Sequence, residues 1–173
     1  SILSGLIISN AQVSQNLDGL SDGNITSTVS STTMYQSGGG CGNVWKIDNR
    51  GDNGNQDCSS PCSGKVAVIT YSCCNQDEIL YSDAITPNAT SLNISFDYRY
   101  NHYSSSDEFW VYLYNETDDA NVATLVNLTT DGEASFSNSN YSLTGSNSGT
   151  DSYRLKFRYK GNCGWGASVD NFS

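Results

Sequence analysis

The amino-acid sequence predicts an all-β fold, an antiparallel β-sandwich of the jelly-roll type. The clearest sign is the alternation over residues 153–160, where four apolar or aromatic side chains are interleaved with four cationic ones. A period of two with one apolar row and one charged row is typical of a strand buried on one face. Sixteen glycines and many Asn and Asp residues supply turns, and we find no helical periodicity beyond a turn or two. About ten short strands joined by turns therefore indicate a single domain over residues 1–173.

The first half of the chain holds the less regular of these strands. Residues 2–13 are rich in Ile, Leu and Val, which favours a strand that is buried on both faces or paired with something else. Residues 25–35 are rich in Ser and Thr, and we expect a strand that is solvated on one side. Shorter strands are expected over residues 43–48, 65–72 and 78–85. The polar stretch 48–57 predicts an irregular loop.

The second half of the chain alternates more strongly. We expect strands over residues 91–100, 107–115, 121–128, 133–142, 153–160 and 165–172. The dipeptide Asp131-Gly132 separates two of them and predicts a hairpin turn. In 107–115, apolar side chains on one face alternate with an aromatic row on the other, formed by Trp110, Tyr112 and Tyr114. Each strand thus has a candidate core face and a candidate outer face.

The cysteines and the glycosylation motifs indicate the compartment. An even number of cysteines predicts an oxidising environment and up to three disulfides, whose pairing stays open, among Cys41, Cys58, Cys62, Cys73, Cys74 and Cys163. Asn-X-Ser/Thr motifs are only mildly in excess of chance for this composition, and they lie at Asn24, Asn88, Asn93, Asn115, Asn127, Asn140 and Asn171. We therefore expect a secreted or cell-surface glycoprotein that carries N-linked glycans.

Charge and hydropathy exclude several kinds of partner. The formal net charge is -10, which argues against nucleic acid and anionic membrane surfaces. No apolar run approaches the roughly 18 residues that a membrane span needs, so we expect none. The sequence begins at Ser1 with an apolar run that has no basic residue before it. We expect a processed chain or a piece of a longer one rather than an intact signal peptide.

The sequence offers no recognisable catalytic motif. It has no Gly-x-Ser-x-Gly elbow, no histidine pair of the zinc type and no phosphate-binding loop. The only histidine, His102, falls in an expected loop, where such a side chain is usually just solvated. The cysteines suit disulfides better than nucleophilic catalysis in an oxidising compartment. The expectation is a protein that is not an enzyme.

Three segments of the C-terminal half resemble the MAM-like jelly-roll domains of secreted and cell-surface proteins. They are LNISFDY over 92–98, DEFWVYLY over 107–114 and FRYKGNCGWGASVDN over 157–171. The resemblance implies a jelly roll in which Gly164 and Gly166 let the chain pass closely beside Trp165. It also implies adhesion, matrix assembly or sugar binding, and it does not choose between them.

Structural calcium is the cofactor that the sequence favours most, although a solvated loop explains the same residues better. Hard cations bind clustered oxygen ligands, and the loop 48–57 contains Asp48, Asp52 and Asp57. Their spacing is not that of an EF-hand. The family resemblance adds Asp170, because related jelly rolls often hold a calcium ion near the terminal strand.

The aromatic row on 107–115 has two interpretations. Trp110, Tyr112 and Tyr114 could stack on sugar rings, with Arg99 or His102 adding polar contacts, as in a carbohydrate-binding module. The competing interpretation, which we favour at this stage, is that a loop, the N-terminal strand or a neighbouring subunit covers the row.

The cationic row of residues 153–160 needs anionic partners. Arg154, Lys156, Arg158 and Lys160 would repel one another at about 7 Å spacing unless negative charge lies opposite. Asp97 and loop acids could supply that charge within the chain. Otherwise the row would meet an acidic glycan or another copy of this acidic protein.

The main functional hypothesis is self-assembly. The apolar N-terminal residues lack an obvious hairpin partner, so residues 1–13 could be donated to the sheet of a neighbouring copy through Ile2, Leu3, Leu6, Ile7 and Ile8. A head-to-tail contact that does not close makes a fibre. We expect a homo-oligomer or polymer with a structural or adhesive role, such as a filament or matrix subunit. The alternative is a carbohydrate-binding module with an aromatic sugar-stacking face.

Overall fold

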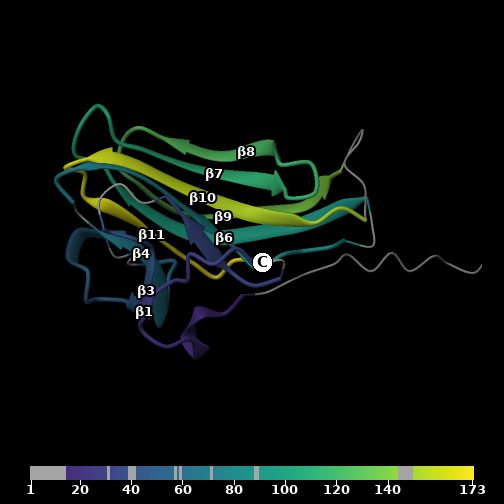
Figure 1. The fold of residues 1–173 in the computed structure, drawn as a ribbon, viewed down its shortest axis with the longest axis horizontal. Coiled ribbons are helices and arrows are strands. Elements are labelled where there is room, and N and C mark those ends of the chain that lie inside the picture. The colour runs from purple at the N-terminus through teal and green to yellow at the C-terminus, as the bar shows by residue number, and fades with distance from the viewer. Residues whose placement is uncertain are drawn as a thin grey trace, which may run out of the picture.

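The protein forms two antiparallel β-sheets that pack face to face (Figure 1). The computed structural model describes residues 15–30, 32–38, 42–56, 58, 60–70, 72–87, 90–143 and 150–173. The larger sheet has the strand order β1 (Gly23–Asn24), β3 (Lys46–Asn49), β4 (Lys65–Thr70), β11 (Gly166–Asp170), β6 (Ser91–Asn101) and β9 (Gly132–Ser142). The smaller sheet has the order β2 (Tyr35–Ser37), β5 (Asn75–Tyr81), β10 (Tyr153–Asn162), β7 (Glu108–Asn115) and β8 (Ala120–Leu128).

This architecture confirms the predicted all-β sandwich of the jelly-roll type. Two short 3-10 helices, η1 (Leu17–Gly19) and η2 (Gly54–Gln56), accompany the strands. Within the described ranges, no helix is long and apolar enough to cross a membrane. The predicted N-terminal strand, residues 2–13, lies outside the described residues, as do Ile2, Leu3, Leu6, Ile7 and Ile8. Self-assembly through them stays a prediction.

The core lies between the sheets, where the apolar rows of the strands meet. Strand β10 contributes Tyr153, Leu155, Phe157 and Tyr159, all of them buried, as their alternation predicts. The Phe157 ring packs edge-on against Phe96 of β6, with ring centroids 5.5 Å apart. Because the two strands belong to opposite sheets, this contact joins the layers.

The predicted strand over residues 25–35 is wrong for most of its length. Only Tyr35 belongs to a strand, and the described residues between 25 and 34 are irregular. Side chains within the segment bond its own backbone: Thr26 Oγ1 accepts from the Thr28 amide at 3.1 Å, and Ser30 Oγ accepts from the Thr33 amide at 3.0 Å. Such local bonds of Ser and Thr compete with sheet pairing.

The predicted hairpin at Asp131-Gly132 is also wrong. Strand β8 pairs with β7, whereas β9 pairs with β6 in the other sheet. The dipeptide lies in the connection between β8 and the start of β9, where the chain changes sheets. A turn signal reports local backbone conformation and carries no information about which strand lies next to which.

Candidate functional site

The outward side of the smaller sheet gathers the aromatic and cationic rows. Strands β7 and β10 are neighbours, and their register places Trp110 opposite Arg158, Tyr112 opposite Lys156 and Tyr114 opposite Arg154. The intervening side chains of both strands are buried in the core. We call this surface, with the adjoining residues of β5 and β2, the outer face. The sequence therefore predicts correctly that both rows point away from the core.

Cations and rings are interleaved across the outer face. The Arg158 guanidinium lies 5.1 Å from the centroid of the Trp110 ring. The Lys156 ammonium lies 4.8 Å from the Tyr114 centroid and 5.7 Å from that of Tyr81. Each cation is attracted by the negative face of a ring. These contacts reduce the repulsion between like charges along β10.

Tyr114 is less accessible than the other two aromatic residues of the predicted row. It is only 8% exposed and packs against Tyr81, which in turn stacks on Tyr35 at 4.6 Å. Trp110 and Tyr112 are half-buried and keep part of their rings at the surface. The accessible aromatic surface is therefore formed by Trp110 and Tyr112, with Tyr114 as part of their support.

Acidic partners neutralise three of the four cations; they include a predicted loop acid, Glu116 between β7 and β8, but not the predicted Asp97. Both oxygens of Asp77 accept from Arg158, at 2.6 and 2.5 Å, and the hydrogen bonds with Arg158 hold the pKa of Asp77 below its usual value. Lys160 lies 3.7 Å from Glu108. Asp97, the partner expected from the sequence, belongs to β6 in the other sheet.

Arg99 and His102, expected to flank the aromatic row, also lie away from the outer face. Arg99 is on β6 of the larger sheet, where its guanidinium pairs with Glu133 at 2.8 Å. His102 follows the same strand, and its Nδ1 lies 3.2 Å from the Tyr100 hydroxyl. Polar groups beside Trp110 and Tyr112 come instead from β10, because β10 is the strand paired with β7.

Arg154 departs from the pattern of a solvated cation, because its side chain is fully buried. Its Nη atoms donate to the carbonyl oxygens of Ser30, Thr33 and Ser82, and its Nε lies 3.0 Å from Glu116. The irregular segment before β2 thus folds over the end of the cationic row. Within the described residues, this segment covers Arg154, whereas Trp110 and Tyr112 of the aromatic row, for which a cover was predicted, are half-buried.

Lys156 has a different environment from its three neighbours in the row. Among the described residues, no carboxylate lies within 4.0 Å of its ammonium, whereas the other three cations each have one. Burial, followed by repulsion from Arg158, lowers the pKa of Lys156 below its ordinary value. Lys156 therefore is a partly desolvated cation between aromatic rings.

A second exposed aromatic group lies at the end of the sandwich and was not singled out as a site in the sequence. The rings of Tyr103 and Trp165, 60% and 38% exposed, meet edge to face with centroids 5.7 Å apart. With Cys73 and Cys163 they line an open depression of about 540 Å³. These residues come from three separate connections between the sheets, so only the fold brings them together. We call this group the loop-end pocket.

The glycines on either side of Trp165 lie close to other parts of the chain. A Cβ at Gly166 would lie 2.1 Å from the Ile69 carbonyl oxygen, and the residue has a φ of +122°. A Cβ at Gly164 would lie 2.2 Å from the Tyr159 hydroxyl. Any larger residue at either position would clash.

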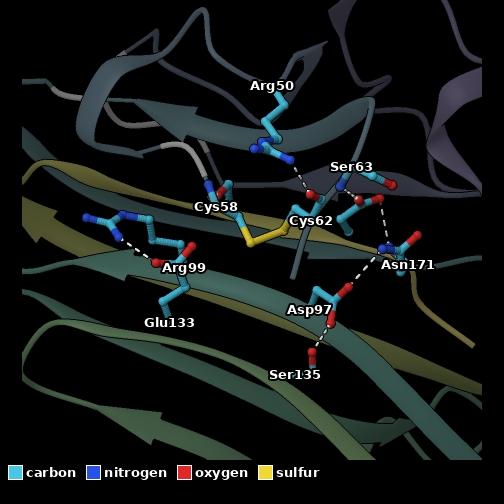
Figure 2. Close-up of a disulfide and its surroundings, with 11 residues drawn as sticks. Arg50, Cys58, Cys62, Ser63, Asp97, Arg99, Glu133, Ser135 and Asn171 are labelled. Carbon is cyan, nitrogen blue, oxygen red and sulfur yellow. Dashed lines mark hydrogen bonds and ion pairs between the residues drawn. A yellow bond between two sulfur atoms is a disulfide. The ribbon is translucent and has the colours of Figure 1, made fainter. Parts of the chain in front are cut away.

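The cysteine prediction is confirmed in part. Cys58 and Cys62 form a disulfide that is buried beside β4 (Figure 2), and Cys74 is also disulfide-bonded. Cys41 lies outside the described residues. Cys73 and Cys163 are not joined by a disulfide, but the hydrogen bond between their side chains raises the pKa of the Cys163 thiol.

We expect Cys73 and Cys163 to be joined when the protein is produced in an oxidising compartment, because a hydrogen bond links their side chains and both line the loop-end pocket. Digestion of the unreduced, alkylated protein followed by mass spectrometry should give one linked peptide that contains both residues. The variant Cys163→Ser should leave Cys73 open to alkylation. Alkylation of both thiols in the oxidised wild type would contradict the expectation.

Figure 2 shows the polar network on the outward side of the larger sheet, around Asp97 and Asn171. Asn171 Nδ2 donates to Asp97 at 2.8 Å, and Ser135 donates to the same carboxylate at 2.5 Å. The adjacent Asp170 is 2% exposed and accepts from the Ser63 amide at 3.0 Å. Burial raises the pKa of Asp170 to about 6.

The predicted calcium ligands are not gathered in one place. Asp48 pairs with Lys46 at 2.6 Å, Asp52 lies in the following loop, and Asp170 is on β11. Asp57 lies outside the described residues. Across the described ranges, no three Asp, Glu, His or Cys side chains converge as metal ligands. Calcium binding stays a prediction.

The glycosylation motifs differ in accessibility. Asn24, Asn127 and Asn171 are exposed, and Asn93 is half-buried. Asn115 is fully buried, and its amide donates to Asp118 at 3.1 Å and to Asp151 at 3.0 Å, so the prediction of a glycan at Asn115 is wrong for the folded protein. Asn88 and the side chain of Asn140 lie outside the described part of the chain. Occupancy of the others stays a prediction.

Comparison with known proteins gives a fold but no family. No protein-family model matches the chain, and no curated protein does. Similar solved structures include the carbohydrate-binding module TmCBM61 in complex with β-1,4-galactotriose, with a TM-score of 0.53, 12% identity and coverage of 80% of this chain and 85% of that one. The K1 cleaved adhesin domain of Lys-gingipain from Porphyromonas gingivalis W83 has a TM-score of 0.57 and 13% identity, with 92% and 95% covered.

A third similar structure comes from a study of the promiscuous specificity of carbohydrate-binding modules of the β-sandwich superfamily. That structure has a TM-score of 0.54 and 12% identity, and the match covers 82% of this chain and 56% of the other. The protein thus has a β-sandwich fold that is also found in carbohydrate-binding modules and adhesin domains. The resemblance to MAM-like domains stays a prediction.

Proposed function

We propose that this protein is an extracellular, non-enzymatic glycan-binding module that holds a glycan on its outer face. The observation that carries the proposal is the accessible pair Trp110 and Tyr112, which lies opposite Arg158 and Lys156 in the register of β7 and β10. Aromatic rings bind the C–H face of sugars, while planar polar groups beside them bind the hydroxyls. The outer face offers both within one sheet.

Contact with Arg158 restricts the Trp110 ring before any ligand arrives. Asp77 holds the Arg158 guanidinium through two hydrogen bonds, and the guanidinium covers part of the Trp110 ring. A side chain held in this way loses little conformational entropy on binding. Carbohydrate-binding modules and an adhesin domain of similar fold support this choice over self-assembly. Glycan binding would itself give the protein an adhesive role.

The variant Trp110→Ala tests the proposal. We expect it to weaken the best glycan found on an array by at least about tenfold, which is about 1.4 kcal/mol, because the main stacking ring is lost. Isothermal titration calorimetry gives the dissociation constant. Trp165→Ala in the loop-end pocket is the matched control and should bind as the wild type does.

Two results would contradict the proposal. Loss of binding in Trp165→Ala but not in Trp110→Ala would move the site to the loop-end pocket. A wild-type protein that binds no glycan on a broad array, while its unfolding is cooperative, would remove the glycan-binding function altogether.

A further inference from the structure

We propose that the glycan held on the outer face is acidic, and that a carboxylate or sulfate group of the sugar binds the Lys156 ammonium. The inference rests on the proposed function and adds the class of ligand. It follows from the one cation of the row for which the described residues supply no ion pair, although its environment is already partly desolvated.

The acidic groups nearest to Lys156 bind other partners. Asp77 binds Arg158, and the Asp119 carboxylate accepts from the Tyr114 hydroxyl at 2.7 Å. Both acids attract Lys156 only from beyond ion-pair distance, while Arg158 repels it. The hydrogen bond from Tyr114 leaves Asp119 charged, but Asp119 lies beyond ion-pair distance of Lys156. Arg158 and Asp77 neutralise each other, as do Lys160 and Glu108, so Lys156 is the cation of this surface without an ion pair among the described residues. An anionic group is the ligand that this charge favours.

The position of Lys156 also suits a sugar that stacks on the aromatic pair. Lys156 and Tyr112 are directly opposite each other on neighbouring strands, so their Cβ atoms are about 5 Å apart. A substituent at the edge of a ring stacked on Tyr112 would therefore lie within reach of the long, flexible lysine side chain. The Tyr81 ring, on β5 at the other side of β10, lies 5.7 Å from the ammonium, and the Tyr114 ring, on β7 like Tyr112, lies 4.8 Å from it.

The net charge of -10 does not oppose such a ligand strongly. Repulsion from distant surface acids is screened beyond about 8 Å at physiological ionic strength. Contact with Lys156 takes place at a few ångströms in a partly desolvated site, where the same charge acts more strongly. The short-range attraction therefore decides the preference for acidic over neutral chains.

The test compares acidic and neutral oligosaccharides of equal length. Oligogalacturonate and a sulfated chondroitin tetrasaccharide serve as the acidic probes, and the matching neutral galacto-oligosaccharide as the neutral one. We expect the wild type to bind one acidic probe at least about tenfold more tightly than the neutral one, a difference of about 1.4 kcal/mol. Lys156→Met should lose this preference, so that its dissociation constants for the acidic and the neutral probes differ by less than about twofold.

Two further variants separate charge from packing. Lys156→Arg keeps the positive charge and should keep the preference. Lys160→Met removes the cation paired with Glu108 and should also keep it. An unchanged preference in Lys156→Met, or a wild type that does not prefer either acidic probe while Trp110→Ala still loses binding, would overturn this inference and leave the proposed function intact. Absence of binding to all probes and to the array would remove both.

Discussion

Replacing Arg154 with methionine should lower the free energy of unfolding by about 3–5 kcal/mol, because a buried charge network would lose its centre. The guanidinium supplies the donors for three backbone carbonyls, and its Nε lies 3.0 Å from Glu116. Methionine fills much of the volume but donates no hydrogen bond. The carbonyls of Ser30, Thr33 and Ser82 would then be left with fewer partners in a site that water reaches poorly.

The measurement is urea-induced unfolding at pH 7.5, followed by circular dichroism. Lys160→Met is the control, since Lys160 is half-exposed and lies 3.7 Å from Glu108. We expect the control to change stability by less than about 1 kcal/mol. Equal unfolding midpoints for Arg154→Met and Lys160→Met would show that Arg154 is not a structural centre. Because Arg154 is buried, we expect Arg154→Met to weaken glycan binding only if it also lowers the free energy of unfolding.

The sequence alone predicts much of the fold, because alternation is a local property. The row Tyr153, Leu155, Phe157 and Tyr159 is buried, and the opposite row points outward, as the period of two requires. Local patterns do not show which strands pair. For this reason the sequence predicts a hairpin at Asp131-Gly132, whereas in the structure β8 pairs with β7 and β9 pairs with β6 in the other sheet.

The candidate site was predictable only in part, for the same reason. The outward aromatic row follows from alternation on β7, but the burial of Tyr114 depends on Tyr35 and Tyr81, which come from distant segments. In the cationic row the four side chains look equivalent in the sequence. Only the fold makes Arg154 buried, pairs Arg158 with Asp77 and leaves Lys156 without an ion pair among the described residues.

Replacing Asp107 with alanine should have an effect of similar size, about 3 kcal/mol or more, at the opposite end of the sandwich. Asp107 is fully buried and precedes β7. One carboxylate oxygen accepts from the amides of Tyr103 and Ser104, at 3.3 and 3.0 Å. The other accepts from the Ser104 hydroxyl and from the Asn162 amide, each at 3.0 Å. The carboxylate thus ties the β6–β7 connection to the end of β10.

The positions of these hydrogen bonds predict which amides should become less protected in Asp107→Ala. Alanine would leave the three partly buried amide donors without the acceptor that now binds them, and a donor left unpaired costs about 1–3 kcal/mol when it is buried and less when water reaches it. In Asp107→Ala, hydrogen exchange of the amides of Tyr103, Ser104 and Asn162 should become faster, and the urea midpoint should fall. Asp107→Asn keeps one acceptor oxygen, so its exchange rates and its urea midpoint should lie between those of Asp107→Ala and the wild type. The loop-end pocket would loosen, because Tyr103 and Trp165 flank the tied segments. If exchange at these three amides stayed at the wild-type rate in Asp107→Ala, the carboxylate would not be what holds this end of the sandwich together.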